Sequence, residues 1–129
     1  MIRSMDQEGY VQPLIPLQEM TMKPVQKITV NNKGGYVFNF SVQWVDDNGN
    51  WITSAWNSGN YTAGFSRTTP DLNTIGVPDD ALAVTVYGHA VLGRSAQGTP
   101  FVAFVRNDQI ATYDAVGTTI IGFAINLIE

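Results

Sequence analysis

Hydrophobic and polar positions alternate with a period of two over much of this chain. The clearest run extends from Tyr36 to Trp44, where every second residue is aromatic or aliphatic and most residues between them are polar. Such alternation is typical of a β-strand that buries one face and exposes the other. The same argument, applied to the other alternating runs, predicts which side chains form the core. These are Phe38, Phe40, Val42, Val84, Val86, Phe123 and Ile125.

Turn residues divide the chain into further segments of this kind. Asn48-Gly49 is a strong hairpin signal, and Pro70, Gly76 and Pro78 mark a longer connection. No window of about ten residues repeats with the period of a helix. The expected strands are 25–31, 36–44, 51–56, 61–65, 82–92, 101–105, 109–113 and 118–128. Short strands at this spacing predict an all-β fold, an antiparallel β-sandwich of about eight strands.

The first part of the chain follows a different pattern. Pro13 and Pro16 flank Leu14-Ile15, and proline disfavours helices and central strands because it lacks a backbone N–H. We therefore divide the chain into an extended N-terminal arm, residues 1–24, and a β-sandwich domain, residues 25–129. We expect the arm to lie on the domain or on a neighbouring subunit, and a partly disordered tail is the alternative.

Composition and charge exclude several classes of function. The formal net charge is −4 and the seven basic residues are scattered, which argues against electrostatic binding of nucleic acid. The chain has no cysteine, so disulfides, thiol catalysis and cysteine-ligated zinc are excluded. No apolar run has the length of a signal peptide or of a membrane span. We expect a cytoplasmic protein, or one secreted without a recognisable signal peptide.

Residues that could support catalysis or bind a metal do not form a pattern in the sequence. The single histidine, His89, lies in an expected strand without a partner nearby in sequence. Asp46, Asn48 and Asn50 have the spacing that begins a calcium loop, but no glutamate closes it. We therefore expect no enzyme, no metal and no cofactor. An enzyme built on aspartates and His89 is the less favoured alternative.

Aromatic and amide side chains gather around two successive expected hairpins. Flat aromatic faces beside amides suit sugar rings, and the same rings suit a membrane interface, where one side is apolar and the other is wet. The alternative is that the tryptophans fill the core. The candidate ligand-binding residues are Asn50, Trp51, Trp56, Asn57, Asn60 and Tyr61.

The segment Lys-Ile-Thr-Val-Asn-Asn-Lys-Gly-Gly-Tyr, from Lys27 to Tyr36, is followed by the alternating aromatic strand. This opening resembles that of the small aegerolysin-type β-sandwich proteins, which include a bacterial pesticidal branch. The resemblance implies binding to membrane lipids, often together with a partner protein that forms the pore. All tryptophans of this chain lie between residues 44 and 56 rather than in its C-terminal half. The arm also has no counterpart, so no functional residue is carried over.

Two classes of function remain. The favoured hypothesis is a non-enzymatic recognition module for carbohydrate or membrane-lipid surfaces, as a lectin or toxin component. The alternative is a structural protein that assembles into a homo-oligomer through its arm and its apolar strand faces. The C-terminal segment motivates the alternative, because it is apolar on both faces. One face carries Ile120, Ala124 and Ile128, and the other Ile121, Phe123 and Ile125.

Overall fold

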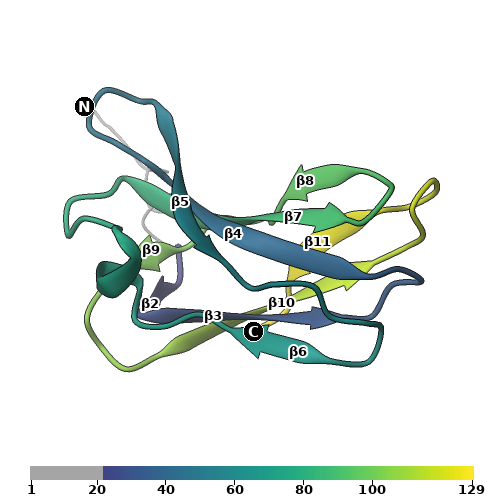
Figure 1. The fold of residues 1–129 in the computed structure, drawn as a ribbon. Helices are drawn as coiled ribbons and strands as arrows, with labels where there is room; N and C mark the ends of the chain where they lie inside the picture. Colours follow the sequence, from purple (N-terminus) through teal and green to yellow (C-terminus); the bar gives the residue numbers. More distant parts are fainter. Residues whose placement is uncertain (1–21) are drawn as a thin grey trace, which may run out of the picture.

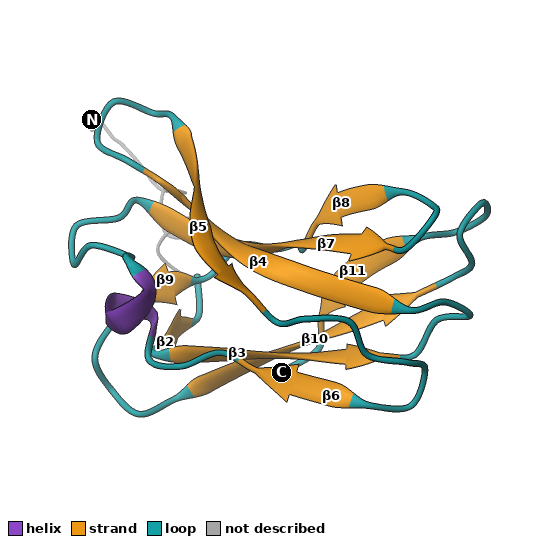
Figure 2. Ribbon diagram, in the orientation of Figure 1, coloured by secondary structure: helices purple, strands orange, loops and turns teal. Residues whose placement is uncertain are grey.

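Two four-stranded sheets pack face to face in residues 22–129, the part of the chain that the computed structural model describes (Figure 1 and Figure 2). The first sheet, in the order β11-β10-β3-β6, contains β3 (Lys27–Asn32), β6 (Ser66–Thr68), β10 (Ile110–Val116) and β11 (Ala124–Leu127). The second, in the order β5-β4-β7-β8, contains β4 (Phe38–Val45), β5 (Trp51–Asn57), β7 (Ala83–Ala90) and β8 (Ser95–Gln97). The prediction of an all-β sandwich is confirmed.

The expected core lies between the two sheets. Strand β4 alternates strictly between buried and partly buried residues, as its sequence pattern predicts. It pairs along its whole length with β7, so that Val42 lies opposite Val86 and Phe38 opposite Ala90. Gly88 on β7 leaves the space that the Phe38 ring and the Ile125 side chain occupy. Of the residues expected in the core, Phe123 alone is only partly buried.

Not every strand pair is antiparallel. Strands β3 and β10 run parallel, with Val30 opposite Tyr113. Strand β2 (Pro24–Val25) also pairs in parallel with β9 (Ala103–Phe104). Between β3 and β10, the chain contributes strands to the second sheet. It then returns to the first sheet, where β10 lies beside β3 and runs in the same direction. This pairing joins segments far apart in sequence, which local alternation does not reveal.

Several expected strands have different limits in the structure, and one strand lies where a loop was expected. Residues 61–65 are mostly loop, and the edge strand is β6, which begins at Ser66. Strand β8 lies in a segment expected to be a loop. In the expected strand 118–128, only Ala124–Leu127 is a strand, because the Thr118 hydroxyl accepts the N–H groups of Ile120 and Ile121 and closes a turn.

The beginning of the β domain differs slightly from the expected boundary. Pro24 already belongs to β2, so the domain includes a residue that the sequence places in the arm. The backbone N–H of Ala103 donates to the carbonyl of Lys23, which extends this pairing. Residues 1–21 of the expected arm lie outside the described residues, and its docking stays a prediction.

Candidate functional site: an apolar tip at the loop end

Loops that are distant in sequence meet at one end of the sandwich, on the right in Figure 1. They are residues 33–37, 58–65, 91–94 and 117–123, which we call the loop end. Backbone hydrogen bonds of 2.9 Å join Gly35 N–H to the Gly117 carbonyl and Val91 N–H to the Val37 carbonyl. The loop end is therefore a connected surface rather than a set of separate turns.

Large aliphatic side chains project into solvent from two of these loops. Leu92 is 97% exposed, Ile120 72% and Ile121 74%. The two loops touch, because a Cβ atom added to Gly93 would lie 2.8 Å from the Thr119 Cβ. We call Leu92, Ile120 and Ile121 the apolar tip. Exposure of neighbouring aliphatic side chains is unfavourable in water, and contiguous apolar patches often mark binding surfaces.

The loop conformations hold these side chains outward. Leu92 has a backbone φ of 64°, a left-handed conformation that is strained for a leucine. It is enclosed by a tight turn, in which Gly93 N–H donates to the Ala90 carbonyl at 2.8 Å and Ala90 N–H to the Arg94 carbonyl at 2.9 Å. Backbone strain of this kind persists where the surrounding structure enforces it, and it often occurs at functional sites.

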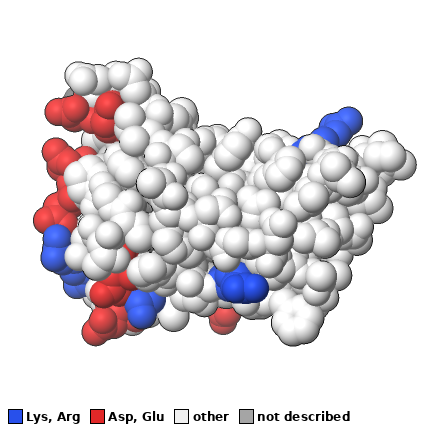
Figure 3. Space-filling view, in the orientation of Figure 1, with Lys and Arg blue, Asp and Glu red and all other residues white. Residues whose placement is uncertain are grey.

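Acidic side chains gather at the opposite end of the sandwich. On the face drawn in Figure 3, most charged groups lie at the end that carries the β4–β5 turn. The turns and the short helix η2 (Leu72–Ile75) at this end are held together by hydrogen bonds such as that from Leu82 N–H to the Val45 carbonyl. The acidic residues at this end are Asp46, Asp47, Asp71, Asp79, Asp80 and Asp108.

The loop end carries few charges by comparison. Lys33 pairs with Asp114 at 3.4 Å, and Arg94 follows the tip residue Leu92 in the β7–β8 loop. Within residues 22–129, most acidic groups therefore lie at one end, and the most exposed aliphatic groups lie at the other.

The candidate residues predicted from the sequence form two groups, one towards each end of strand β5. Asn50 and Trp51 lie at its start, beside the β4–β5 turn, whereas Asn57 ends it and leads towards the loop end. Trp51 is 38% exposed and packs edge-on against Phe101, with ring centres 5.1 Å apart. Trp56 instead packs on Phe40 and is partly buried. The structure does not gather the three tryptophans on one surface, because Trp44 belongs to the core.

The amides near the end of β5 are engaged by neighbouring polar groups. The Asn57 Nδ2 donates to Asn39 Oδ1 at 3.2 Å and to Ser41 Oγ at 3.0 Å. The Asn39 Nδ2 donates to Asn60 Oδ1 at 3.0 Å. Tyr61 is only 4% exposed. Its hydroxyl donates to a backbone carbonyl in β3, and burial raises the pKa of Tyr61 well above its usual value.

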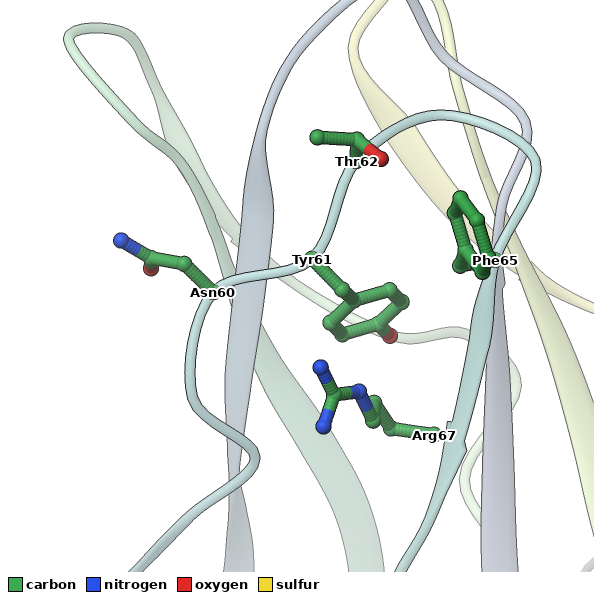
Figure 4. Close-up of a pocket in the computed structure, with 5 residues that line it drawn as sticks. All are labelled: Asn60, Tyr61, Thr62, Phe65 and Arg67. Carbon is green, nitrogen blue, oxygen red and sulfur yellow. The ribbon is translucent and has the colours of Figure 1, made fainter.

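A shallow hollow of about 270 Å³ lies beside Tyr61, at the open edge of the sandwich (Figure 4). Its lining includes Phe65, which is 63% exposed, and Arg67, whose guanidinium carbon lies 5.3 Å from the centre of the Tyr61 ring. The Asn60 side chain points away from the other lining residues. The hollow is lined by Asn60, Tyr61, Thr62, Phe65 and Arg67.

Of the candidate residues from the sequence, Asn60 and Tyr61 line this hollow, whereas Phe65, Arg67 and the apolar tip were not among the candidates. Ile120 and Ile121 were assigned to a strand and Leu92 to a strand end. A signal for the tip does exist, since Gly93 follows Leu92, while Gly117 and Gly122 enclose the other loop. Both Gly117 and Gly122 have positive φ values, of 88° and 71°, as glycine in turns often does.

Searches for two other kinds of site are negative within residues 22–129. No helix in that range is long and apolar enough to cross a membrane. The same residues contain no cluster of three or more histidine, aspartate or glutamate side chains placed to hold a metal ion.

Comparisons with known proteins find similarity in structure rather than in sequence. No family model matches the chain, and no curated protein matches it. Listeriolysin O is 20% identical with a TM-score of 0.45, and the match covers 80% of this chain and 22% of that toxin. The membrane-binding domain of pneumolysin is 17% identical with a TM-score of 0.41, and the match covers 81% of this chain and 96% of that domain.

A third similar structure, described as a Gram-negative toxin, is 19% identical with a TM-score of 0.46. The match covers 79% of this chain and 22% of that toxin. The chain thus spans about a fifth of the length of listeriolysin O and of this toxin. These likenesses concern the β fold alone, and they do not show the aegerolysin relationship.

Proposed function

We propose that this domain is a non-enzymatic module that binds a lipid surface by inserting its apolar tip. The observation that carries the proposal is the exposure of Leu92, Ile120 and Ile121 on touching loops. Aliphatic side chains that project from a convex end can enter the boundary between headgroups and acyl chains without changing the fold. The aegerolysin resemblance also implies lipid binding, and we include that implication in this proposal.

The energy available from the tip is adequate for reversible binding. Complete burial of an aliphatic side chain contributes roughly 1.5–3 kcal/mol, so three contribute at most about 4–9 kcal/mol. This range corresponds to dissociation constants from about 1 mM to below 1 μM. We therefore expect peripheral and reversible attachment.

The size of the tip favours a lipid surface over a protein partner. At ~25 cal/mol per Å², the energies above correspond to roughly 60–120 Å² for each side chain, and to less than about 400 Å² for the tip. A standard protein interface buries about 800 Å² on each partner. The distribution of charge supports an orientation with the apolar tip towards the lipid, because the acidic end would then point away from anionic headgroups.

We assign no catalytic role to His89. Its Nδ1 lies 2.9 Å from the Ser95 hydroxyl across the exposed β7–β8 pair. This distance and the exposed setting support a surface hydrogen bond.

The test uses the full-length chain and lipid vesicles. Replacing Leu92, Ile120 and Ile121 together with serine should abolish sedimentation with vesicles. The circular dichroism spectrum should remain that of the unchanged β protein, because these side chains make little contact with the core. Sedimentation of the triple variant at the level of the original chain would refute the proposal.

A matched control removes three aliphatic groups from the acidic end. Leu82, Val105 and Ile110 are 55%, 45% and 43% exposed. Replacing all three with serine should leave vesicle binding unchanged. An equal loss in both triple variants would show that general surface hydrophobicity, rather than the tip, determines binding.

A further inference from the structure

The hollow beside Tyr61 contains an arginine that lies against an aromatic ring and, within residues 22–129, has no carboxylate partner. The ion pairs of residues 22–129 join Lys27 to Asp71, Lys33 to Asp114 and Arg106 to Asp79, and none includes Arg67. The Arg67 guanidinium instead lies across the face of the Tyr61 ring (Figure 4). Stacking on an aromatic face orients the guanidinium and leaves its N–H donors available.

The other lining residues suit a sugar. Phe65 presents an exposed aromatic ring, and aromatic rings pack against the C–H face of a sugar. Thr62 provides a hydroxyl that can donate or accept a hydrogen bond. The guanidinium fork of Arg67 matches the two oxygens of a carboxylate. Together, these groups fit one sugar ring that carries a carboxylate.

The position of the hollow argues against a lipid phosphate as its ligand. Arg67 lies opposite Val30 on β3, and Val30 lies opposite Tyr113 on β10. The loop that carries Ile120 begins four residues later, at Gly117, which corresponds to roughly 13 Å along a strand. Since inserted groups reach about 5–10 Å into the headgroup boundary, the backbone of Arg67 would remain outside that boundary. Sugars that project from a membrane surface extend to that height.

We propose that the hollow binds a carboxylate-bearing sugar displayed on a cell surface. The height of the sugar above the membrane surface rests on the proposed lipid binding, whereas the recognition of the sugar by the hollow does not. The ligand is defined by two contacts: the carboxylate on Arg67 and the C–H face on Phe65.

The experiment titrates the full-length protein with sialyllactose and with lactose in the absence of lipid, and follows binding by NMR. Lactose is the control because it lacks the sialic acid residue and, with it, the carboxylate. Sialyllactose should bind at least tenfold more tightly than lactose, since a charge-assisted contact to Arg67 is lost. Equal affinity for the two sugars, or no binding of sialyllactose, would overturn the proposal. Shifts produced equally well by acetate would reduce the site to an anion site and would also overturn it.

Variants assign the binding to the hollow. Arg67→Gln should weaken sialyllactose binding at least tenfold, and Phe65→Ala should weaken both sugars. Arg94→Gln is the matched control, because it removes an exposed arginine that lies outside the hollow, in the β7–β8 loop, and it should have no effect. Unchanged affinity in Arg67→Gln would contradict the assignment.

Two carriers could display this sugar. Vesicles that contain a sialylated glycolipid and beads that carry a sialylated glycoprotein distinguish them. Retention by the beads, or stronger retention by these vesicles than by vesicles without the glycolipid, supports the proposal, and neither result overturns it. Loss of plain vesicle binding in the tip variant with sugar binding intact would leave this inference standing. Binding of plain vesicles by the original chain, without binding of sialyllactose, would refute it and leave the proposed lipid binding standing.

Discussion

Replacing Leu92 with asparagine should stabilise the fold and weaken lipid binding at the same time. Leu92 has a φ of 64° and is 97% exposed, so it contributes strain without compensating packing. A left-handed conformation costs roughly 1–2 kcal/mol for an ordinary residue, and asparagine tolerates it better. We expect a gain of about 1 kcal/mol in the free energy of unfolding, or about 4 °C in melting temperature.

The same substitution removes one of the three groups that would enter the lipid. If Leu92 is fully inserted, its loss costs roughly 1.5–3 kcal/mol. This corresponds to a decrease in vesicle affinity of about 10- to 150-fold. If Leu92 lowers stability but raises affinity for lipid, its contribution to binding would explain why a strained leucine occupies this position.

Thermal unfolding followed by circular dichroism and vesicle sedimentation measure the two effects. Leu92→Ala provides the control, because it removes the apolar group while the positive φ remains unfavourable. It should lower affinity without raising the melting temperature. If Leu92→Asn destabilised the protein, or left vesicle affinity unchanged, the reasoning about this residue would be wrong.

Further predictions concern the core, the contact between the loops and the response to pH. Phe40→Ala should lower the free energy of unfolding by about 3–5 kcal/mol, because the ring is fully buried; a loss below about 1 kcal/mol in urea unfolding would contradict its place in the core. Gly93→Ala should lower both vesicle affinity and melting temperature, because the new methyl group would lie 2.8 Å from the Thr119 Cβ and 3.1 Å from its Cα and the loop backbone must shift; unchanged affinity would show that the loop contact is unimportant. Burial raises the pKa of Tyr36 and Tyr113 to about 12. Unfolded tyrosines ionise near pH 10, so the contribution to stability is complete below about pH 10 and is lost as the pH rises towards 12. Urea unfolding at a series of pH values should show this decrease, and constant stability over that range would exclude it.

The sequence was most informative for strands with one buried face, because burial requires an apolar residue at every second position. Strand β4 has one face in the core, and its alternation predicted both its extent and its buried residues. The same rule failed for residues 118–128. Ile121 continues the alternation of the buried Ile125, but hydrogen bonds to the Thr118 hydroxyl close a turn before the strand begins. Local polar contacts of this kind compete with the strand and leave the apolar pattern unchanged.

The site was predicted less well because its determinants are not local. The amides of Asn57 and Asn60 seemed available for a ligand, yet both bond to Asn39 on a neighbouring strand. Tyr61 seemed to be a surface aromatic, but it is buried under Arg67. The tip depends on two loops, one after β7 and one after β10, which meet only in the tertiary fold.

The proposed lipid binding is tested most directly by the environment of a label at the tip. Because the chain has no cysteine, Ile121→Cys provides a unique site for an environment-sensitive fluorophore, and Leu82→Cys provides the control at the acidic end. When full-length protein binds lipid vesicles, the emission of the label at position 121 should shift to the blue, while the label at position 82 should not respond. A protein that binds vesicles while only the label at position 82 responds would contradict insertion through the apolar tip.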